Sequence, residues 1–156
     1  MFLDDADRTD FCARLARVVK KCDWKCRAFC LMTTHYHLVV DVDQNALQRG
    51  MHGLNGPYAQ EFNRRHGRSG HLRGDRYHAF AVTSEGHMLQ LIRYLARNPV
   101  VAGLCDSPAA WRWGSYRGCI GLDAGFPFVT NEAVHACFGR DNATAIRILR
   151  AFVEDA

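Results

Sequence analysis

The sequence lacks the features that mark secreted disulfide-rich proteins and membrane proteins. Its seven cysteines include no CxxC pair, and no signal peptide precedes them, so a disulfide framework is not expected. No apolar run approaches the roughly 18 residues that cross a bilayer. Internal repeats and low-complexity tracts are also absent. We therefore expect a protein of the reducing cytoplasm with no membrane partner.

The chain does have enough apolar residues for one core, together with a moderate excess of positive charge. Its 156 residues are 48% hydrophobic, which suits one domain better than two. Twenty Lys and Arg residues stand against 16 Asp and Glu residues, a net charge of +4. The excess suits a polyanionic partner, but many proteins without such a partner are as basic. Charge alone does not identify nucleic acid as the ligand.

Apolar spacing predicts the elements of the first half. A helix over residues 5–21 carries an apolar stripe, with acidic residues at its start and lysines at its end, as the helix dipole favours. Residues 24–42 are too long for one strand and predict a hairpin that turns at Thr33-Thr34. A second helix after Asp43 is predicted from apolar residues at helical spacing: Leu47, Met51, Leu54, Tyr58 and Phe62.

The next segment is less regular. The polar run 63–70 predicts a mobile basic loop, and residues 76–82 predict a strand. Thr83 or Ser84 can cap a following helix, which Pro99 is expected to stop. That helix should end near Asn98.

The remaining residues predict a connection and two helices. Residues 111–121 are rich in Trp, Gly and Ser, and their aromatic side chains are expected to seat the C-terminal segment. Helical patterns then start near Thr130 and Asn142. The whole order predicts an α+β fold, with a ferredoxin-like (RRM-like) antiparallel sheet whose first strand is missing from the chain, plus C-terminal helices. We expect one domain at 1–120 and a helical appendage at 121–156.

Two histidines in the hairpin are candidates for chemistry. His35 and His37 are separated by one residue on a predicted strand, so both imidazoles leave the same face, while Tyr36 points to the other. Such a pair is half of a metal site. The alternative is two strand histidines that make ordinary hydrogen bonds.

A second pair lies on the helix that precedes Pro99. Tyr94 and Asn98 are four residues apart and share a helix face. The amide oxygen of Asn98 is a hard ligand of the kind that Mg²⁺ accepts. By themselves, the tyrosine could equally be a core residue and the asparagine a helix end.

The strings around these pairs resemble one family. Residues 29–40 (FCLMTTHYHLVV) and 93–104 (RYLARNPVVAGL) are similar to the HUH signature and the nucleophile helix of the REP-associated tyrosine transposases and related single-tyrosine insertion-sequence transposases. Residues 63–72, 74–77 and 111–117 fall where similar stretches fall in that family. The resemblance runs in order over roughly residues 3–120.

This resemblance implies a site and a reaction. His35, His37 and Asn98 would hold Mg²⁺ or Mn²⁺, and Tyr94 would be the nucleophile that cuts single-stranded DNA through a 5′-phosphotyrosine intermediate. The DNA would contain a hairpin, and a homodimer is left open. Arginines around the glycine-rich loop would follow the DNA backbone, although a solvated basic loop is the alternative: Arg64, Arg65, Arg68, Arg73 and Arg76. Tyr77 or His78 would stack on bases.

The sequence departs from the family pattern at its start. Relatives carry a central strand ahead of Phe2, and without it two strand edges are expected to lack a partner. A wrong or internal start, a decayed gene, or another segment or subunit that fills the gap would each account for this.

Two rival functions remain at this point. A decayed transposase would bind single-stranded or hairpin DNA without cutting it. A zinc-binding regulator would instead use Cys22, Cys26 and Cys30 with the histidines.

Overall fold

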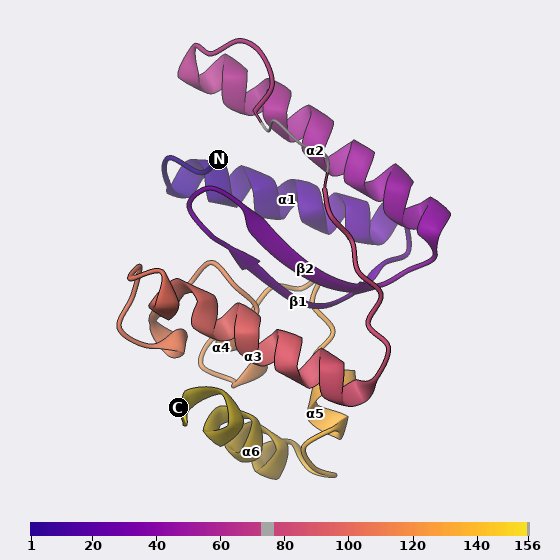
Figure 1. Cartoon of the computed structure of the whole chain (residues 1–156), viewed down its shortest axis with the longest axis vertical. Helices are drawn as coiled ribbons and strands as arrows, with labels where there is room; N and C mark the ends of the chain where they lie inside the picture. Colours follow the sequence, from indigo (N-terminus) through magenta and orange to yellow (C-terminus); the bar gives the residue numbers. More distant parts are fainter. Residues whose placement is uncertain (73–76, 156) are drawn as a thin grey trace.

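The computed structural model describes residues 1–72 and 77–155 (Figure 1). It is an α+β structure, as predicted. Its elements, in chain order, are α1 (Asp5–Lys21), β1 (Lys25–Leu31), β2 (Tyr36–Asp41), α2 (Gln44–His66), α3 (Glu85–Val101), the 3₁₀ helix η1 (Pro108–Ala110), α4 (Tyr116–Cys119), α5 (Glu132–Ala136) and α6 (Asn142–Glu154).

Helix α1 has the bounds that the sequence predicts. The side chain of Asp4 accepts a hydrogen bond from the backbone N–H of Asp7 at 2.9 Å and so caps the first turn. Phe11, Leu15 and Val18 form its buried stripe, which packs the helix against the sheet.

The predicted hairpin is also present, and its two strands are antiparallel. Leu31 pairs with Tyr36 and Cys30 with His37, so Thr33 and Thr34 lie in the turn. Strand β2 begins at Tyr36, one residue after the start of the histidine pair. The described residues form this two-stranded sheet and no larger one, so the ferredoxin-like arrangement stays a prediction.

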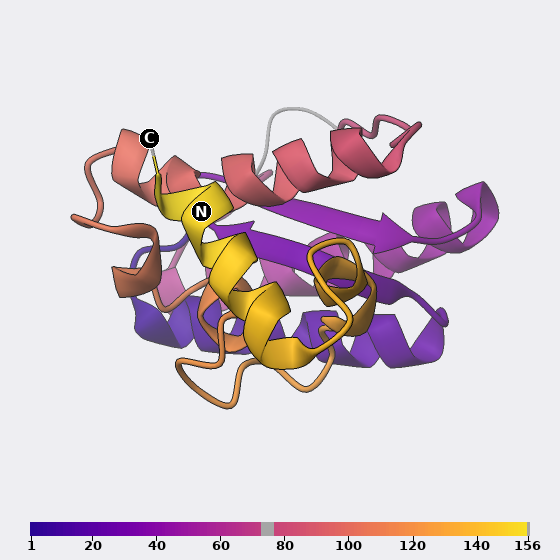
Figure 2. The same ribbon diagram turned by 90° about the horizontal axis from the view of Figure 1, so that it is seen from below.

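The hairpin is the middle layer of the molecule. Helices α1 and α2 cover one face of it, and α3 lies on the other (Figures 1 and 2). Each face has its own hydrophobic core: Phe11, Phe29 and Tyr58 belong to the first, and Cys30, Ile92 and Leu149 to the second. The site described below lies on the α3 face.

A β-bulge at Arg27 divides the residues of β1 between these cores. The register shifts between Cys26 and Ala28, so Cys26 is buried in the core under α1 and α2, whereas Ala28 and Cys30 are buried in the core under α3. Without the bulge, all three side chains would point to one face.

The outer edge of β1 is paired by later parts of the chain. Leu31 N–H donates to the Trp113 carbonyl at 2.8 Å, and Ser115 N–H donates to the Phe29 carbonyl at 3.0 Å. Trp113 is buried, so the aromatic connection seats the C-terminal segment as predicted. Strand β2, in contrast, pairs only with β1 among the described residues.

The strand predicted over residues 76–82 is not formed in the part that the structure describes. Residues 77–83 are irregular, and Phe80 is 87% exposed. A β-strand is stable only when its backbone groups pair with a neighbour, and this segment has no strand partner among the described residues. That prediction was therefore wrong for residues 77–82.

Two helix ends also differ from the predictions. Helix α2 continues through residues 63–66, which were expected in a mobile loop, and ends at Gly67 with the left-handed φ of 60°. Ion pairs hold these residues, and cations at a helix C-terminus are favourable. Helix α3 passes through Pro99 to Val101. The proline cannot donate a backbone hydrogen bond to the preceding turn, but its ring is buried in the core, and this packing favours the helical position.

The C-terminal helix packs on α3. Leu149 and Val153 of α6 are fully buried in the same core as Ile92 of α3. Residues 134–153 thus share a core with the rest of the chain, and the domain boundary at 120 remains a prediction. No helix within residues 1–72 and 77–155 is long and apolar enough to cross a membrane.

Candidate active site

The hairpin turn sets the position of both histidines. Met32 N–H donates to the His35 carbonyl at 2.9 Å, and Phe2 N–H donates to the Thr33 carbonyl at 2.9 Å. These bonds fix the turn against the N-terminal residues. Because His35 and His37 are two positions apart in extended backbone, both rings lie on the α3 side of the sheet.

The two imidazole rings meet edge to face. His35 Nε2 lies 3.1 Å from His37 Nε2, a hydrogen bond in which one ring donates and the other accepts. Their ring centroids are 4.9 Å apart at an interplanar angle of 89°. Thr34 Oγ1 lies 3.1 Å from His35 Nδ1 and helps to orient that ring. Two ring nitrogens therefore converge on one point.

Helix α3 brings the second predicted pair to the same place. Ser84 Oγ accepts a hydrogen bond from His87 N–H at 3.1 Å and starts the helix. Asn98 Nδ2 donates to His37 Nε2 at 3.2 Å. The Tyr94 ring lies 5.5 Å from the His37 ring, centroid to centroid, at 80°. The structure thus brings together His35, His37, Tyr94 and Asn98.

The local electrostatics favour a neutral imidazole at His37. Partial burial lowers the pKa of His37, and the neighbouring His35 lowers it further. A neutral ring keeps a nitrogen lone pair, which a metal ion or a hydrogen-bond donor can use. His37 Nε2 lies within hydrogen-bond distance of His35 Nε2 and of Asn98 Nδ2. A neutral His37 ring can accept hydrogen bonds from both.

Tyr94 is the most accessible member of the group. It is 53% exposed, and its hydroxyl makes no hydrogen bond within the described part of the chain. Its ring packs on His37, which orients the side chain.

The arginine candidates fall into two groups. Arg64 pairs with Glu61 on the surface of α2, while Arg65 pairs with both Asp4 and Asp7 at the start of α1. The guanidinium of Arg68 lies 5.8 Å from the ring centroid of Phe62. Arg73 and Arg76 lie outside the described residues. Arg65 is held by its two ion pairs between α2 and the start of α1. Arg64 and Arg68 are therefore more available to contact a ligand.

A carboxylate cluster that sequence reasoning missed surrounds Arg65. Ligand atoms of Asp4, Asp7 and His66 lie within 4.8 Å of one another. Leu3 N–H donates to Asp7 at 2.8 Å, and His66 and Arg65 contact the same carboxylate. The cluster is filled by protein donors, so we interpret it as the clamp that joins α1 to α2. No sequence spacing could have revealed it, because 58 positions separate Asp7 from Arg65.

The clamp lies at the C-terminal end of α2. The C-terminal end of α2, the hairpin turn and the C-terminal end of α3 all lie at the same end of the molecule (Figure 1).

The cysteine-based zinc site is not formed. Cys26 and Cys30 are buried in different cores, on opposite faces of the hairpin. Burial raises the pKa of each thiol to about 12, which disfavours the thiolate that zinc requires. Both residues act as core side chains.

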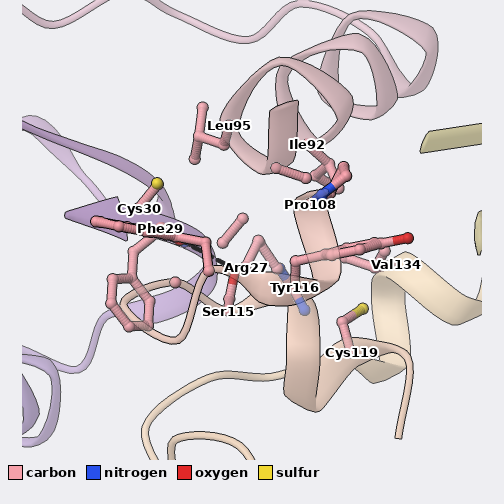
Figure 3. Close-up of a pocket in the computed structure, with 14 residues that line it drawn as sticks. Arg27, Phe29, Cys30, Ile92, Leu95, Pro108, Ser115, Tyr116, Cys119 and Val134 are labelled. Carbon is pink, nitrogen blue, oxygen red and sulfur yellow. Dashed lines mark hydrogen bonds between the residues drawn. The ribbon is translucent and has the colours of Figure 1, made fainter. Parts of the chain in front are cut away.

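A separate cavity under β1 is too small for a substrate. It has a volume of about 20 Å³, close to that of one water molecule. Phe29 and Cys30 of β1, Leu95 of α3, and Tyr116 and Cys119 of α4 surround it (Figure 3). We interpret it as a packing gap rather than a catalytic pocket.

Two histidines from a hairpin, with a tyrosine and an asparagine from a helix, are a set of groups suited to phosphoryl-transfer chemistry. In a comparison with known families, a family model described as "Transposase IS200 like" matches residues 1–98. The chain belongs to the IS200-like transposase family. Searches of curated proteins and of solved structures each gave no match. Membership indicates a transposase-type, DNA-processing function.

Proposed function

We propose that this protein is a metal-dependent single-strand DNA endonuclease and strand transferase with Tyr94 as its nucleophile. The observation that carries the proposal is the convergence of His35, His37 and Asn98 beside the Tyr94 ring. These residues come from two elements that are remote in sequence. Chemistry, rather than local packing, gives a reason for so many polar groups at one point.

The histidine pair has the spacing of ligands on a single ion. Two ligand atoms about 2.1 Å from an octahedral ion and about 90° apart are about 3 Å from each other. His35 Nε2 and His37 Nε2 are 3.1 Å apart, which fits this spacing. The Asn98 amide nitrogen is 3.2 Å from His37 Nε2, and rotation of the amide group would place its oxygen there as a ligand. These three residues would hold Mg²⁺ or Mn²⁺. A bound divalent ion would neutralise charge on the phosphate oxygens.

The residues of the chain would act as follows. Tyr94 Oη forms a bond to phosphorus, and the bond from phosphorus to the 3′ oxygen breaks. The phenolic proton leaves to solvent, to which Tyr94 is open, and the departing 3′ oxygen takes a proton from water. The product is a 5′-phosphotyrosine with a free 3′-hydroxyl. Attack by a second 3′-hydroxyl reverses these steps and joins strands without ATP.

The substrate is proposed to be single-stranded DNA next to a hairpin. Tyr94 is half exposed on an open surface, which suits an unpaired strand that can bend to it. Arg64 and Arg68 at the end of α2 would contact the phosphate backbone. Arg73 and Arg76 would extend this contact, and so would Tyr77 or His78 by stacking on bases.

The test is a covalent adduct on a denaturing gel. The protein is incubated with Mn²⁺ and single-stranded oligonucleotides taken from the DNA that flanks its gene, labelled at one end or the other. A 5′-phosphotyrosine retains the 3′-labelled fragment, whereas the 5′-labelled fragment is released. We expect the shifted band with the 3′ label only, and its loss in Tyr94→Phe and in EDTA. Tyr77→Phe is the matched control and should keep the adduct.

A second candidate function rests on the open hydroxyl of Tyr94. No base contacts this hydroxyl among the described residues, as expected for a protein that binds single-stranded or hairpin DNA without cutting it. That function predicts DNA binding that survives both Tyr94→Phe and EDTA, with no adduct from either labelled oligonucleotide.

A further inference from the structure

The hydroxyl of Thr34 contacts the ring nitrogen of His35 that points away from the histidine pair. Thr34 Oγ1 lies 3.1 Å from His35 Nδ1, and His35 Nε2 lies 3.1 Å from His37 Nε2 on the other side of the ring. Thr34 is exposed in the hairpin turn, which the bond from Met32 N–H to the His35 carbonyl holds in place. The His35 ring is therefore in contact at both nitrogens, and the partner of one nitrogen constrains what the other can do.

The hydrogen bonds of the site determine which ring nitrogens carry hydrogen. Asn98 Nδ2 donates to His37 Nε2 at 3.2 Å, so this nitrogen has a lone pair and no hydrogen. Its contact with His35 Nε2 is then a hydrogen bond only if His35 Nε2 carries the hydrogen. A neutral imidazole has one N–H. In a neutral His35 ring, Nδ1 therefore has the lone pair, and the Thr34 hydroxyl donates to it.

Coordination by His35 would require the opposite arrangement. A histidine that binds an ion through Nε2 has its lone pair on that nitrogen, so its single hydrogen lies on Nδ1. That N–H needs an acceptor, and Thr34 Oγ1 is placed to accept it. A hydroxyl can donate or accept, whereas a carbonyl only accepts and an ammonium only donates. Rotation of the Thr34 O–H bond thus lets one side chain serve both arrangements.

We propose that Thr34 is a positioning residue of the metal site: its hydroxyl stabilises the His35 tautomer that binds an ion through Nε2. His35 Nε2 releases its hydrogen to solvent and Nδ1 takes one from solvent, so the ring stays neutral and the exchange consumes no net proton. The inference rests on the metal-dependent function proposed above. It adds a residue that would not touch the ion but would set how tightly His35 holds it.

The first experiment locates the hydrogen on His35. Two-bond ¹H–¹⁵N NMR spectra distinguish an imidazole N–H from a nitrogen with a lone pair, and they are recorded at about pH 8, above the usual histidine pKa of about 6.5. Spectra of His35→Gln identify the His35 signals. We expect the His35 hydrogen on Nε2 without Mg²⁺ and on Nδ1 with saturating Mg²⁺. A His35 hydrogen on Nδ1 without Mg²⁺, or on Nε2 with it, would overturn the proposal.

The second experiment removes the hydroxyl. Thr34→Val keeps the shape of the side chain, and its Mn²⁺ affinity, measured by isothermal titration calorimetry, should fall about tenfold or more, whereas Thr34→Ser should keep most of the affinity. Thr33→Val is the matched control, since Thr33 is exposed in the same turn and is bonded through its carbonyl. Thermal unfolding should give the same midpoint for both valine variants. An equal loss of affinity in the two variants, or none in Thr34→Val, would contradict the role of the hydroxyl.

The adduct assay separates this inference from the proposed function. If the His35 tautomer changes with Mg²⁺ and Thr34→Val loses Mn²⁺ affinity, but the wild type forms no Tyr94 adduct, Thr34 positions a metal ligand and the nuclease proposal fails. If the wild type forms a Mn²⁺-dependent adduct and Thr34→Val binds Mn²⁺ as tightly as the wild type, the nuclease proposal stands and the role of Thr34 is refuted.

Discussion

Asn98 and His37 meet at 3.2 Å although 61 positions separate them in the sequence. The contact joins the helix that carries Tyr94 to the strand that carries the histidine pair. We therefore include Asn98 in the candidate active site with His35, His37 and Tyr94.

The first prediction concerns metal affinity. Asn98→Leu keeps the size of the side chain but removes its oxygen, so Mn²⁺ affinity should fall about tenfold or more. Asn98→Asp retains an oxygen ligand and should bind Mn²⁺ at least as well as the wild type. Isothermal titration calorimetry measures both. Gln90→Leu, an exposed position on the same helix, is the control, and a wild-type affinity in Asn98→Leu would exclude the amide as a ligand.

The second prediction concerns acid stability. Burial by itself raises the pKa of Asp7, but hydrogen bonds from His66, the Leu3 N–H and Arg65 outweigh it and leave the pKa below its usual 3.8. A carboxyl whose folded pKa is lowered stabilises the fold fully above its unfolded pKa and loses that contribution as pH falls through the folded value. Urea unfolding should therefore show stability falling below about pH 4.

Asp7→Asn should remove much of this pH dependence. It should also cost about 2 kcal/mol of unfolding free energy at neutral pH, because hydrogen bonds to a charged group are lost in a buried place. Asp4→Asn is the control: an exposed asparagine caps a helix nearly as well as aspartate, so its effect should be smaller. A larger loss in Asp4→Asn than in Asp7→Asn would show that Asp7 is not the main carboxylate of the clamp.

The third prediction compares two glycines of α2. A methyl group at Gly50 would lie 2.1 Å from Cζ2 of Trp24, so Gly50→Ala should destabilise the protein by about 3 kcal/mol through overpacking. Gly53→Ala meets only an ordinary contact and should stabilise the helix by about 0.8 kcal/mol. Thermal and urea unfolding give both values, and opposite signs are the expected result.

The fourth prediction tests the attachment of α6. Leu149 is fully buried against α3, so Leu149→Ala should cost about 3 kcal/mol. Ile148 is 37% exposed on the same helix, and Ile148→Ala should cost less than about 1 kcal/mol. Equal, small effects would show that α6 contributes little to the core.

Local patterns predicted much of this structure. The bounds of α1, the Thr33-Thr34 turn and the start of α6 follow from caps, lysines and apolar spacing within a few residues of each other. The pairing of His35 with His37 follows from the alternation of a strand. Each of these features is determined by residues that are close together in the sequence. The sequence alone is therefore enough to predict them.

Other features depend on distant partners, and sequence did not reveal them. The composition of residues 77–82 suits a strand, but a strand also needs an edge to pair with. Arg65 has the context of a DNA-binding arginine, yet Asp4 and Asp7 hold it. The bulge at Arg27 decides which core each cysteine enters, and no residue of β1 marks it.

Helix α3 makes contacts on two neighbouring faces. Tyr94 and Asn98 contact His37, and the arginines next to them contact the C-terminal end of α6. Arg93 Nη2 donates to the Asp155 carbonyl at 2.8 Å, and Arg97 Nη1 donates to the Val153 carbonyl at 3.0 Å. Each arginine immediately precedes one of the two candidate site residues, Tyr94 and Asn98. These two hydrogen bonds add to the apolar packing between α3 and α6 in holding the rotation of α3 about its own axis. The C-terminal end of α6 thus contributes to the direction in which the tyrosine points.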